Sequence, residues 1–114
     1  MLRAGAAPPA LVEPARRIRG RLRPPGDKSI SHRHAIVAAL ARGASHIEGF
    51  APGADCAATL DCLVALGVRV ARTPAGAVDI EGRGLAGLLP PAAPLDARNS
   101  GTTMRLLVGV LAAH

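Results

Sequence analysis

The segment "PPGDKSISHRHAIVAALARG", residues 24–43, carries the strongest structural signal in the sequence. Its Pro-Pro-Gly start ends any preceding element, because proline fixes φ and cannot donate a backbone hydrogen bond. Polar residues with two serines follow, and the pattern then turns helical from Ser29 to Arg42, with Gly43 where glycine often ends a helix. We expect the buried side of this helix to carry Ile36, Val37 and Leu40.

The rest of the chain alternates short elements, which predicts an α/β (α+β) fold. "RRIRGRLR" (16–23) alternates arginine with apolar residues or glycine and predicts a strand with one buried face. A short strand is expected at 45–50, and a second helix capped by Asp55 and closed by Gly67. A hairpin at 68–82 follows, and a third helix begins near Gly101.

The composition excludes several classes of protein. The chain is 49% hydrophobic with one aromatic residue, Phe50, so aliphatic side chains must fill the core. Six of its arginines and a single glutamate lie in residues 1–23, so the net charge of +6 belongs mainly to the N-terminal arm. A nucleic-acid binder usually spreads basic charge over its body and adds aromatic platforms. The composition therefore argues against nucleic acid as a partner.

The cysteines and the apolar runs bear on location. Cys56 and Cys62 are six residues apart in a predicted helix, beyond disulfide reach, and match no metal-ligand spacing. They are expected to be buried thiols in a reducing compartment, which indicates the cytoplasm. No apolar run is long enough for a membrane span. Residues 1–15 are expected to form a mobile leader, with an organellar transit peptide as the alternative.

Lys28 is the only lysine among fourteen Lys and Arg residues, and it stands at a predicted helix start. Helix N-termini present unpaired N–H groups and a positive partial charge, so they bind anions readily. Ser29 and Arg33 are four residues apart and would share one side of the helix. An ammonium group can be shared by two anions, whereas a guanidinium is broad and planar. The alternative is that Ser29 only caps the helix and Lys28 is a surface charge.

The segment "NSGTT" (99–103) repeats this pattern at the third helix. Asn99 and Ser100 can cap the helix, and Gly101 would let a ligand approach the backbone closely. An ordinary polar cap is the alternative interpretation. Two such segments together favour a substrate with more than one anionic group. His32 and His34 lie on different sides of the first helix and are interpreted as structural residues.

The segments "PGDKSISHRHAIVAALARG" and "LDARNSGTTMRLL", with "LGV" between them, resemble the N-terminal portion of the 5-enolpyruvylshikimate-3-phosphate synthase family. The resemblance covers about residues 16–114 and implies a fold of repeated βαβαββ units, present here as a partial domain. It divides the chain into the leader (1–15), a first strand and interdomain crossover (16–25), a first βαβαββ unit (26–97) and the truncated start of a second unit (98–114).

The resemblance also implies an activity. Members transfer the enolpyruvyl (1-carboxyvinyl) group of phosphoenolpyruvate to the 5-hydroxyl of shikimate 3-phosphate and release phosphate, on the route to chorismate and the aromatic amino acids. No metal or organic cofactor is implied. By position, Lys28 would be catalytic and contact both substrates, Ser29 and Arg33 would hold shikimate 3-phosphate, and Asn99 and Gly101 would line the phosphoenolpyruvate pocket.

Several expectations qualify this interpretation. Arg98 stands where the family usually has glycine, and the remaining catalytic residues are expected in a C-terminal part of the same chain, beyond His114. One alternative is a catalytically inactive, anion-binding fragment. The other is the related UDP-N-acetylglucosamine enolpyruvyl transferase, in which "K-N" replaces Lys28-Ser29 and the "SHR" pattern is missing.

Overall fold

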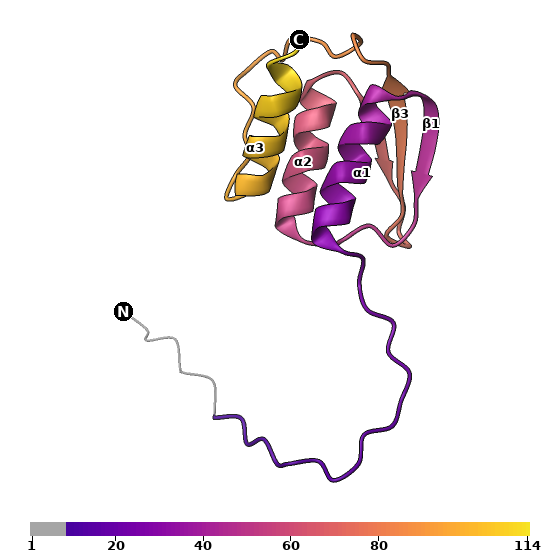
Figure 1. Cartoon of the computed structure of the whole chain (residues 1–114), viewed down its shortest axis with the longest axis vertical. Helices are drawn as coiled ribbons and strands as arrows, with labels where there is room; N and C mark the ends of the chain where they lie inside the picture. Colours follow the sequence, from indigo (N-terminus) through magenta and orange to yellow (C-terminus); the bar gives the residue numbers. More distant parts are fainter. Residues whose placement is uncertain (1–8) are drawn as a thin grey trace.

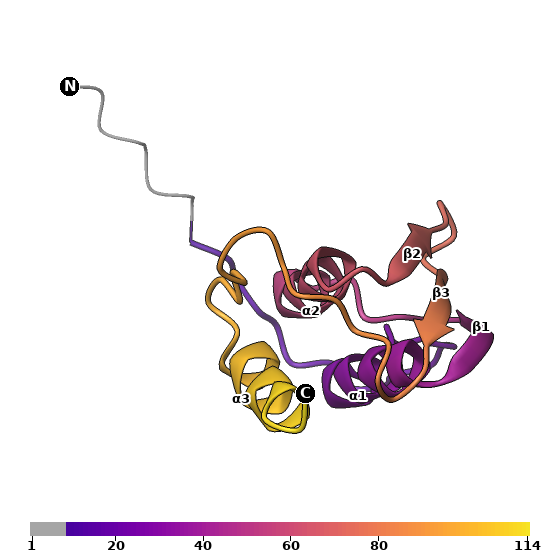
Figure 2. The same ribbon diagram turned by 90° about the horizontal axis from the view of Figure 1, so that it is seen from above.

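The computed structural model describes residues 9–114, which form a mixed α/β fold with a three-stranded sheet. In chain order the elements are α1 (Lys28–Leu40), β1 (Arg42–Ile47), α2 (Ala54–Ala65), β2 (Arg69–Arg72), β3 (Val78–Arg83) and α3 (Gly101–Leu111). Helices α1 and α2 cover one face of the sheet, and α3 lies beyond them, on the side away from the sheet (Figure 2). The predicted α/β class is confirmed.

The sheet has the strand order β1–β3–β2, and both pairs are antiparallel. The predicted hairpin is confirmed as β2 and β3, with Val70 opposite Ile80 and a turn that contains Gly76 at φ +82°. The strand expected at 45–50 forms earlier than predicted, as β1. This happens because Ala41, directly after α1, is already extended and leads the chain straight alongside β3.

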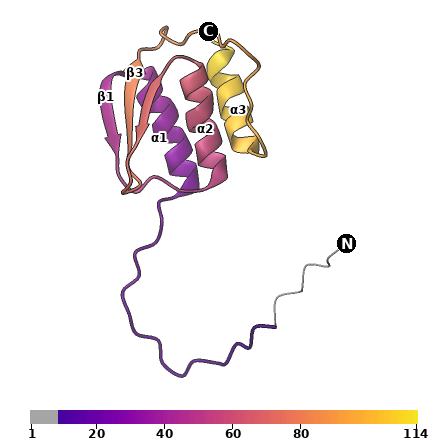
Figure 3. The ribbon, with the colours of Figure 1, turned by 180° about the vertical axis from the view of Figure 1, so that it is seen from behind.

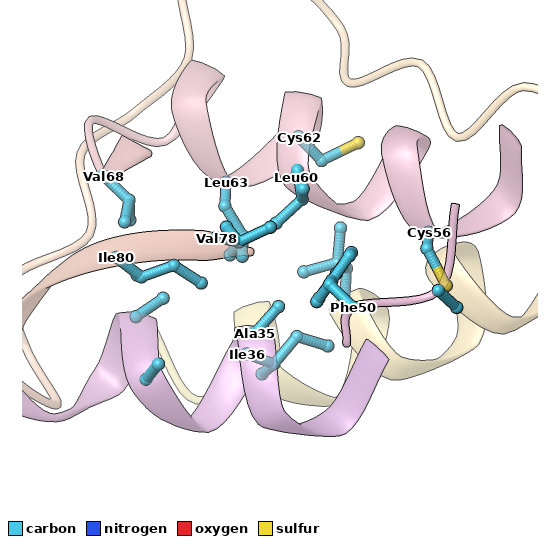
Figure 4. Packing of buried hydrophobic residues seen from close by; sticks show 14 residues of the cluster. Ala35, Ile36, Phe50, Cys56, Leu60, Cys62, Leu63, Val68, Val78 and Ile80 are labelled. Atoms are coloured by element: carbon cyan, nitrogen blue, oxygen red, sulfur yellow. The ribbon is translucent and has the colours of Figure 1, made fainter. Parts of the chain in front are cut away.

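Aliphatic side chains from α1, α2 and β3 point toward one another and form the core (Figure 4). Leu60, Leu63 and Ile80 are at most 2% exposed, and Phe50, the one aromatic residue, packs in the same cluster at 8% exposed. Burying a leucine or isoleucine side chain stabilises the fold by about 1.5–3 kcal/mol. These few residues therefore carry much of the stability of a chain that is nearly free of aromatic residues.

Helix α1 packs through small residues rather than through the side that the sequence predicted. Ala35 and Ala39 are fully buried, and Ile36 is 6% exposed, but Val37 is 66% exposed, so its predicted burial is wrong. The close packing is visible at Gly82 of β3, where an added Cβ would lie 2.3 Å from the carbonyl oxygen of Ala38. Alanine and glycine bring the backbones together, which turns Val37 away from the sheet.

The termini of the helices differ from two further expectations. Gly53, not Asp55, occupies the N-cap position of α2, and Asp55 lies in the first turn. A carboxylate in that turn is favoured by the helix dipole without being the cap. Gly43, expected to close α1, lies inside β1 at φ +93°. Gly67 does follow α2 as predicted, at φ +87°.

Residues 16–25 form no strand in the described structure and run as an exposed extended segment before α1 (Figure 1). This differs from the strand expected at 16–23. A strand is stable only when its backbone groups pair with a neighbour, and no other strand of residues 9–114 pairs with this segment. Its assignment as an interdomain crossover stays a prediction. Most of the leader predicted at 1–15 lies outside the described residues.

Candidate anion-binding site

The N-termini of α1, α2 and α3 lie at the same end of the molecule (Figures 1 and 3). Two contacts join their first turns. The Lys28 ammonium is 3.1 Å from a carboxylate oxygen of Asp55 in α2, and the Thr103 hydroxyl of α3 is 3.2 Å from the Asp55 carbonyl oxygen. Three helix N-termini, each with its positive dipole end, therefore face one edge, an arrangement that attracts anions.

The start of α1 is held by residues other than Ser29. The Asp27 carboxylate accepts a 2.8 Å hydrogen bond from the Ile30 N–H and is the N-cap. Ser31 donates to the Asp27 carbonyl and accepts from the Ala51 N–H, which ties this turn to the loop before α2. Ser29 is exposed, so the interpretation of Ser29 as the helix cap is wrong, and its hydroxyl faces solvent.

Gly26 allows this close approach of the two segments. An added Cβ at Gly26 would lie 1.6 Å from the carbonyl oxygen of Gly49, which no side chain could tolerate. The glycine of the Pro-Pro-Gly turn therefore does more than end an element. It lets the chain before α1 cross the loop that leads into α2 and so places the two helix starts side by side.

Lys28 is paired with Asp55, which the sequence predicts to be a helix cap. The two side chains are 57% and 35% exposed, so the pair lies on the surface and remains open to a ligand. An exposed pair of this kind contributes at most about 1 kcal/mol, and a stronger anion can compete for the ammonium. The sequence places Asp55, an acidic residue, in a first helical turn. It does not indicate the contact with Lys28, because the two residues are far apart in the chain.

Arg33 and Ser29 lie on one side of α1, as their spacing predicted. The Arg33 guanidinium donates a 3.0 Å hydrogen bond to the Ser29 carbonyl oxygen. The side chain thus folds back toward the start of the helix, close to Lys28 in sequence and space. Its other N–H groups are available to an anion at the same edge.

The start of α3 separates the roles of Ser100, Asn99 and Gly101. Ser100 is the cap: its oxygen accepts from the Thr103 N–H at 3.1 Å, and the residue is 3% exposed. Asn99 and Gly101 are exposed and make no part of that cap. Gly101 is the first residue of α3, and an added Cβ there would meet no atom within 4 Å.

Arg98 adopts φ +50° directly before Asn99, the one non-glycine residue between 9 and 114 with positive φ. This geometry explains why glycine would be favoured at the position. Two contacts hold the arginine there: its N–H donates to the Asp96 carboxylate at 2.7 Å, and its guanidinium donates to Asp61 at 2.6 Å. Arg72 of β2 pairs with the other Asp61 oxygen, so Asp61 fixes the loop to the body.

Behind the exposed edge, a chain of buried polar groups connects the three helices. The His32 ring lies 2.6 Å from the Thr59 hydroxyl, which lies 2.7 Å from the Thr103 hydroxyl, itself 2.7 Å from Ser100 Oγ. All four residues are at most 3% exposed. The interpretation of His32 as a structural residue agrees with this burial, whereas His34 is exposed. The sequence offered no signal for this network, because its members are distant in the chain.

Three further features of the described residues concern metal ligands, helix length and the cysteines. In residues 9–114, no group of three or more His, Cys, Asp or Glu side chains could hold a metal ion. No helix in this part of the chain is long and apolar enough to span a membrane. Cys56 and Cys62 are free and buried, as predicted, and burial raises the pKa of both thiols. A raised pKa disfavours the reactive thiolate.

Comparisons with known proteins agree with the resemblance noted in the sequence. Residues 12–114 match the family described as EPSP synthase (3-phosphoshikimate 1-carboxyvinyltransferase). A 3-phosphoshikimate 1-carboxyvinyltransferase of Chloroflexus aurantiacus is 52% identical over 99 residues, which are 87% of this chain and 23% of that protein. The one from Alkalilimnicola ehrlichii is 54% identical over 103 residues, 90% of this chain and 23% of that protein.

A solved structure supports the same relationship. EPSP synthase from Acinetobacter baumannii superposes with a TM-score of 0.77 and 46% sequence identity, over 81% of this chain and 21% of that one. The chain therefore spans less than a quarter of the length of the relatives that it matches.

Proposed function

Because this chain belongs to the EPSP synthase (3-phosphoshikimate 1-carboxyvinyltransferase) family, we propose that it supplies one part of the active site of such an enzyme. The oxygen of the 5-hydroxyl of shikimate 3-phosphate bonds to C2 of phosphoenolpyruvate, and the C2–O bond to phosphate breaks afterwards. The hydroxyl proton leaves to solvent or a base, and C3 of phosphoenolpyruvate gains a proton and becomes a methyl group. That methyl group loses a proton when the enol double bond re-forms, and inorganic phosphate is released.

The observation that carries the proposal is the edge at which three helix N-termini meet. Both substrates are anions, and each carries a phosphate. The described edge offers N–H groups, the Lys28 ammonium and the Arg33 guanidinium to such ligands. A compact ammonium between two anions can stabilise the charge that moves from one to the other during addition and elimination.

The residue roles in the proposal follow the positions of the side chains. Lys28 contacts both substrates after its bond to Asp55 is exchanged or shared, while Ser29 and Arg33 hold shikimate 3-phosphate. Asn99 and Gly101 line the phosphoenolpyruvate pocket. Neither the backbone nor the packing of this chain requires glycine at 101, since an added Cβ would point into open space. A ligand that approaches this backbone would explain the glycine.

The rest of the proposed active site lies outside this chain. The relatives are about four times as long, and the described edge is open rather than enclosed. We infer that a further part of the enzyme covers the edge and contributes the groups that move the protons, with no metal or organic cofactor. The two buried free cysteines favour a reducing location such as the cytoplasm.

A chimera tests the proposal directly. Residues 12–114 of this chain replace the matching segment of the Chloroflexus aurantiacus relative. The release of phosphate from phosphoenolpyruvate is then measured in the presence of shikimate 3-phosphate. We expect turnover by the chimera and a loss of about 100-fold or more with Lys28→Arg, because the broader guanidinium cannot occupy a position between two anions. Near-normal turnover by Lys28→Arg would contradict the role assigned to the ammonium.

Two controls separate this effect from damage to the fold. Arg69→Lys also replaces one cationic side chain by another, here arginine by lysine. It does so in the surface pair with Glu81, on the hairpin away from the edge, and is expected to leave turnover unchanged. The 114-residue chain alone tests the second candidate, an inactive fragment that binds anions. That candidate is favoured because this chain spans only a small part of the length of its relatives, and it predicts phosphate binding without turnover.

A further inference from the structure

The buried chain of polar groups has a direction that its hydrogen-bond partners determine. The Thr103 hydroxyl has a single hydrogen, which faces two acceptors: Ser100 Oγ at 2.7 Å and the Asp55 carbonyl oxygen at 3.2 Å. A carbonyl oxygen can only accept. If Thr103 gives its hydrogen to either of these acceptors, it has none left for Thr59, and Thr59 is then the donor in the 2.7 Å contact between the two hydroxyls.

The same reasoning fixes the state of His32. Because the only hydroxyl hydrogen of Thr59 goes to Thr103, the 2.6 Å contact between Thr59 and His32 Nδ1 requires the ring nitrogen to donate. In this arrangement His32 carries hydrogen on Nδ1, and its Nε2 carries a bare lone pair. That atom is buried and has no hydrogen-bond partner among the described residues.

An unpaired buried acceptor destabilises a fold, so its presence needs a reason. The alternative tautomer would place hydrogen on the isolated Nε2. Thr59 would then donate to His32 Nδ1, and Thr103 would donate to Thr59. This tautomer would also withdraw the Thr103 hydrogen from Asp55 and Ser100. Nε2 is unpaired in either tautomer. Only hydrogen on Nδ1 leaves the Thr103 hydrogen free to hold the start of α3 against the first turn of α2.

We propose that His32 is a positioning residue, whose Nδ1–H sets the direction of the Thr59 and Thr103 hydroxyls and thereby fixes the three helix N-termini relative to one another. Lys28 and Arg33 flank His32 on α1, and Asp55 and Ser100 lie at the other end of the network. Small changes at His32 would therefore be transmitted to both loops of the anion-binding edge, although the imidazole itself is buried.

The charge state of the ring is consistent with this role. Burial lowers the pKa of His32 below its usual value; the Asp55 carboxylate opposes this, and Lys28 and Arg33 lower the pKa further. The ring therefore stays neutral near pH 7. Since protonation would occur on Nε2, it would leave the Nδ1–H donor in place and preserve the direction of the network.

Two substitutions distinguish a donor at Nδ1 from a residue that only fills space. In His32→Asn the side-chain amide places a donor N–H at the δ position, and in His32→Gln the donor moves one atom farther, to the ε position. If His32 positions the network, Asn retains it and Gln disrupts it. A role in packing alone predicts that both variants fail in proportion to their loss of stability.

The first measurement uses the 114-residue chain labelled with ¹⁵N. The ¹⁵N shifts of the His32 ring, identified by comparison with His32→Asn, are expected to show hydrogen on Nδ1. The backbone amide signals of Ser100, Thr103 and Asp55 should change in His32→Gln and stay nearly unchanged in His32→Asn. Hydrogen on Nε2, or equal changes in both variants, would overturn the proposal.

The second measurement rests on the proposed function and uses the chimera with the Chloroflexus aurantiacus relative. We expect His32→Gln to raise KM for both substrates by about tenfold with a smaller change in kcat, and His32→Asn to stay within about twofold. Equal KM values for the two variants would overturn the positioning role. An inactive unsubstituted chimera would instead contradict the proposed function, while the NMR result would still decide the inference about His32.

Discussion

Arg98 offers a test of whether the geometry of the 96–101 loop is held in solution. The residue is kept at φ +50°, where a side chain with a Cβ is disfavoured by about 1–2 kcal/mol. Its guanidinium compensates by pairing with Asp61, but the two side chains are 52% and 43% exposed. A pair so open to solvent contributes about 0.5 kcal/mol.

Two substitutions separate these contributions. Arg98→Ala removes the pair with Asp61 and keeps the strain, so it should lower the free energy of unfolding by about 0.5 kcal/mol. Arg98→Gly removes the pair and the strain together. After about 0.5–1 kcal/mol is subtracted for the greater freedom of glycine in the unfolded chain, the glycine variant should be up to about 1.5 kcal/mol more stable than the alanine variant.

The measurement is urea unfolding of the 114-residue chain and its variants, followed by circular dichroism and analysed at equal slopes. Arg69 in β2 is the matched control, because it is also an exposed arginine in an ion pair but lies in an extended strand. There alanine should be more stable than glycine, so the order is reversed. If Arg98→Ala is more stable than Arg98→Gly, as expected at Arg69, the positive φ is not maintained in solution and the account of this loop is refuted.

Two further predictions concern other parts of the chain. The hydrogen bond from His46 to Asp79 raises the pKa of His46 above 6.5, so the pair stabilises the fold below that pH and loses its effect as pH rises through the folded-state pKa. In urea titrations from about pH 5.5 to 8.5, the stability difference between His46→Gln and the unsubstituted chain should shrink with rising pH, and a difference independent of pH would contradict this. Gly101→Ala should not reduce stability, because the new methyl group meets no atom of this chain, yet it should weaken phosphoenolpyruvate binding by the chimera in calorimetry. Unchanged affinity would show that no ligand approaches this backbone.

Much of the local structure could be predicted from the sequence. The hairpin was found from alternating Val70 and Ile80 around a Pro and Gly turn, and α3 from the NSGTT segment, because both depend on residues near one another in the chain. The spacing of Ser29 and Arg33 likewise gave the correct common side of α1. Local periodicity and turn chemistry require no knowledge of distant contacts.

The errors share a different origin. Val37 was expected to be buried, but alanines and Gly82 set a close packing of α1 on β3 that turned it outward. Asp55 was taken for a cap, although its side chain reaches Lys28 from a different helix. In each case the decisive partner was distant in the sequence, so no local pattern contained it.

The amino-acid order by itself determined the three helices and the hairpin, and it placed a polar, cationic start on α1 and a glycine at the start of α3. Only the tertiary structure decided that these two starts lie at one edge with α2 between them, joined through Asp55 and the buried His32 network. The physical reason is that hydrogen bonds and ion pairs act over about 3 Å, and such distances between remote residues exist only after the helices have packed.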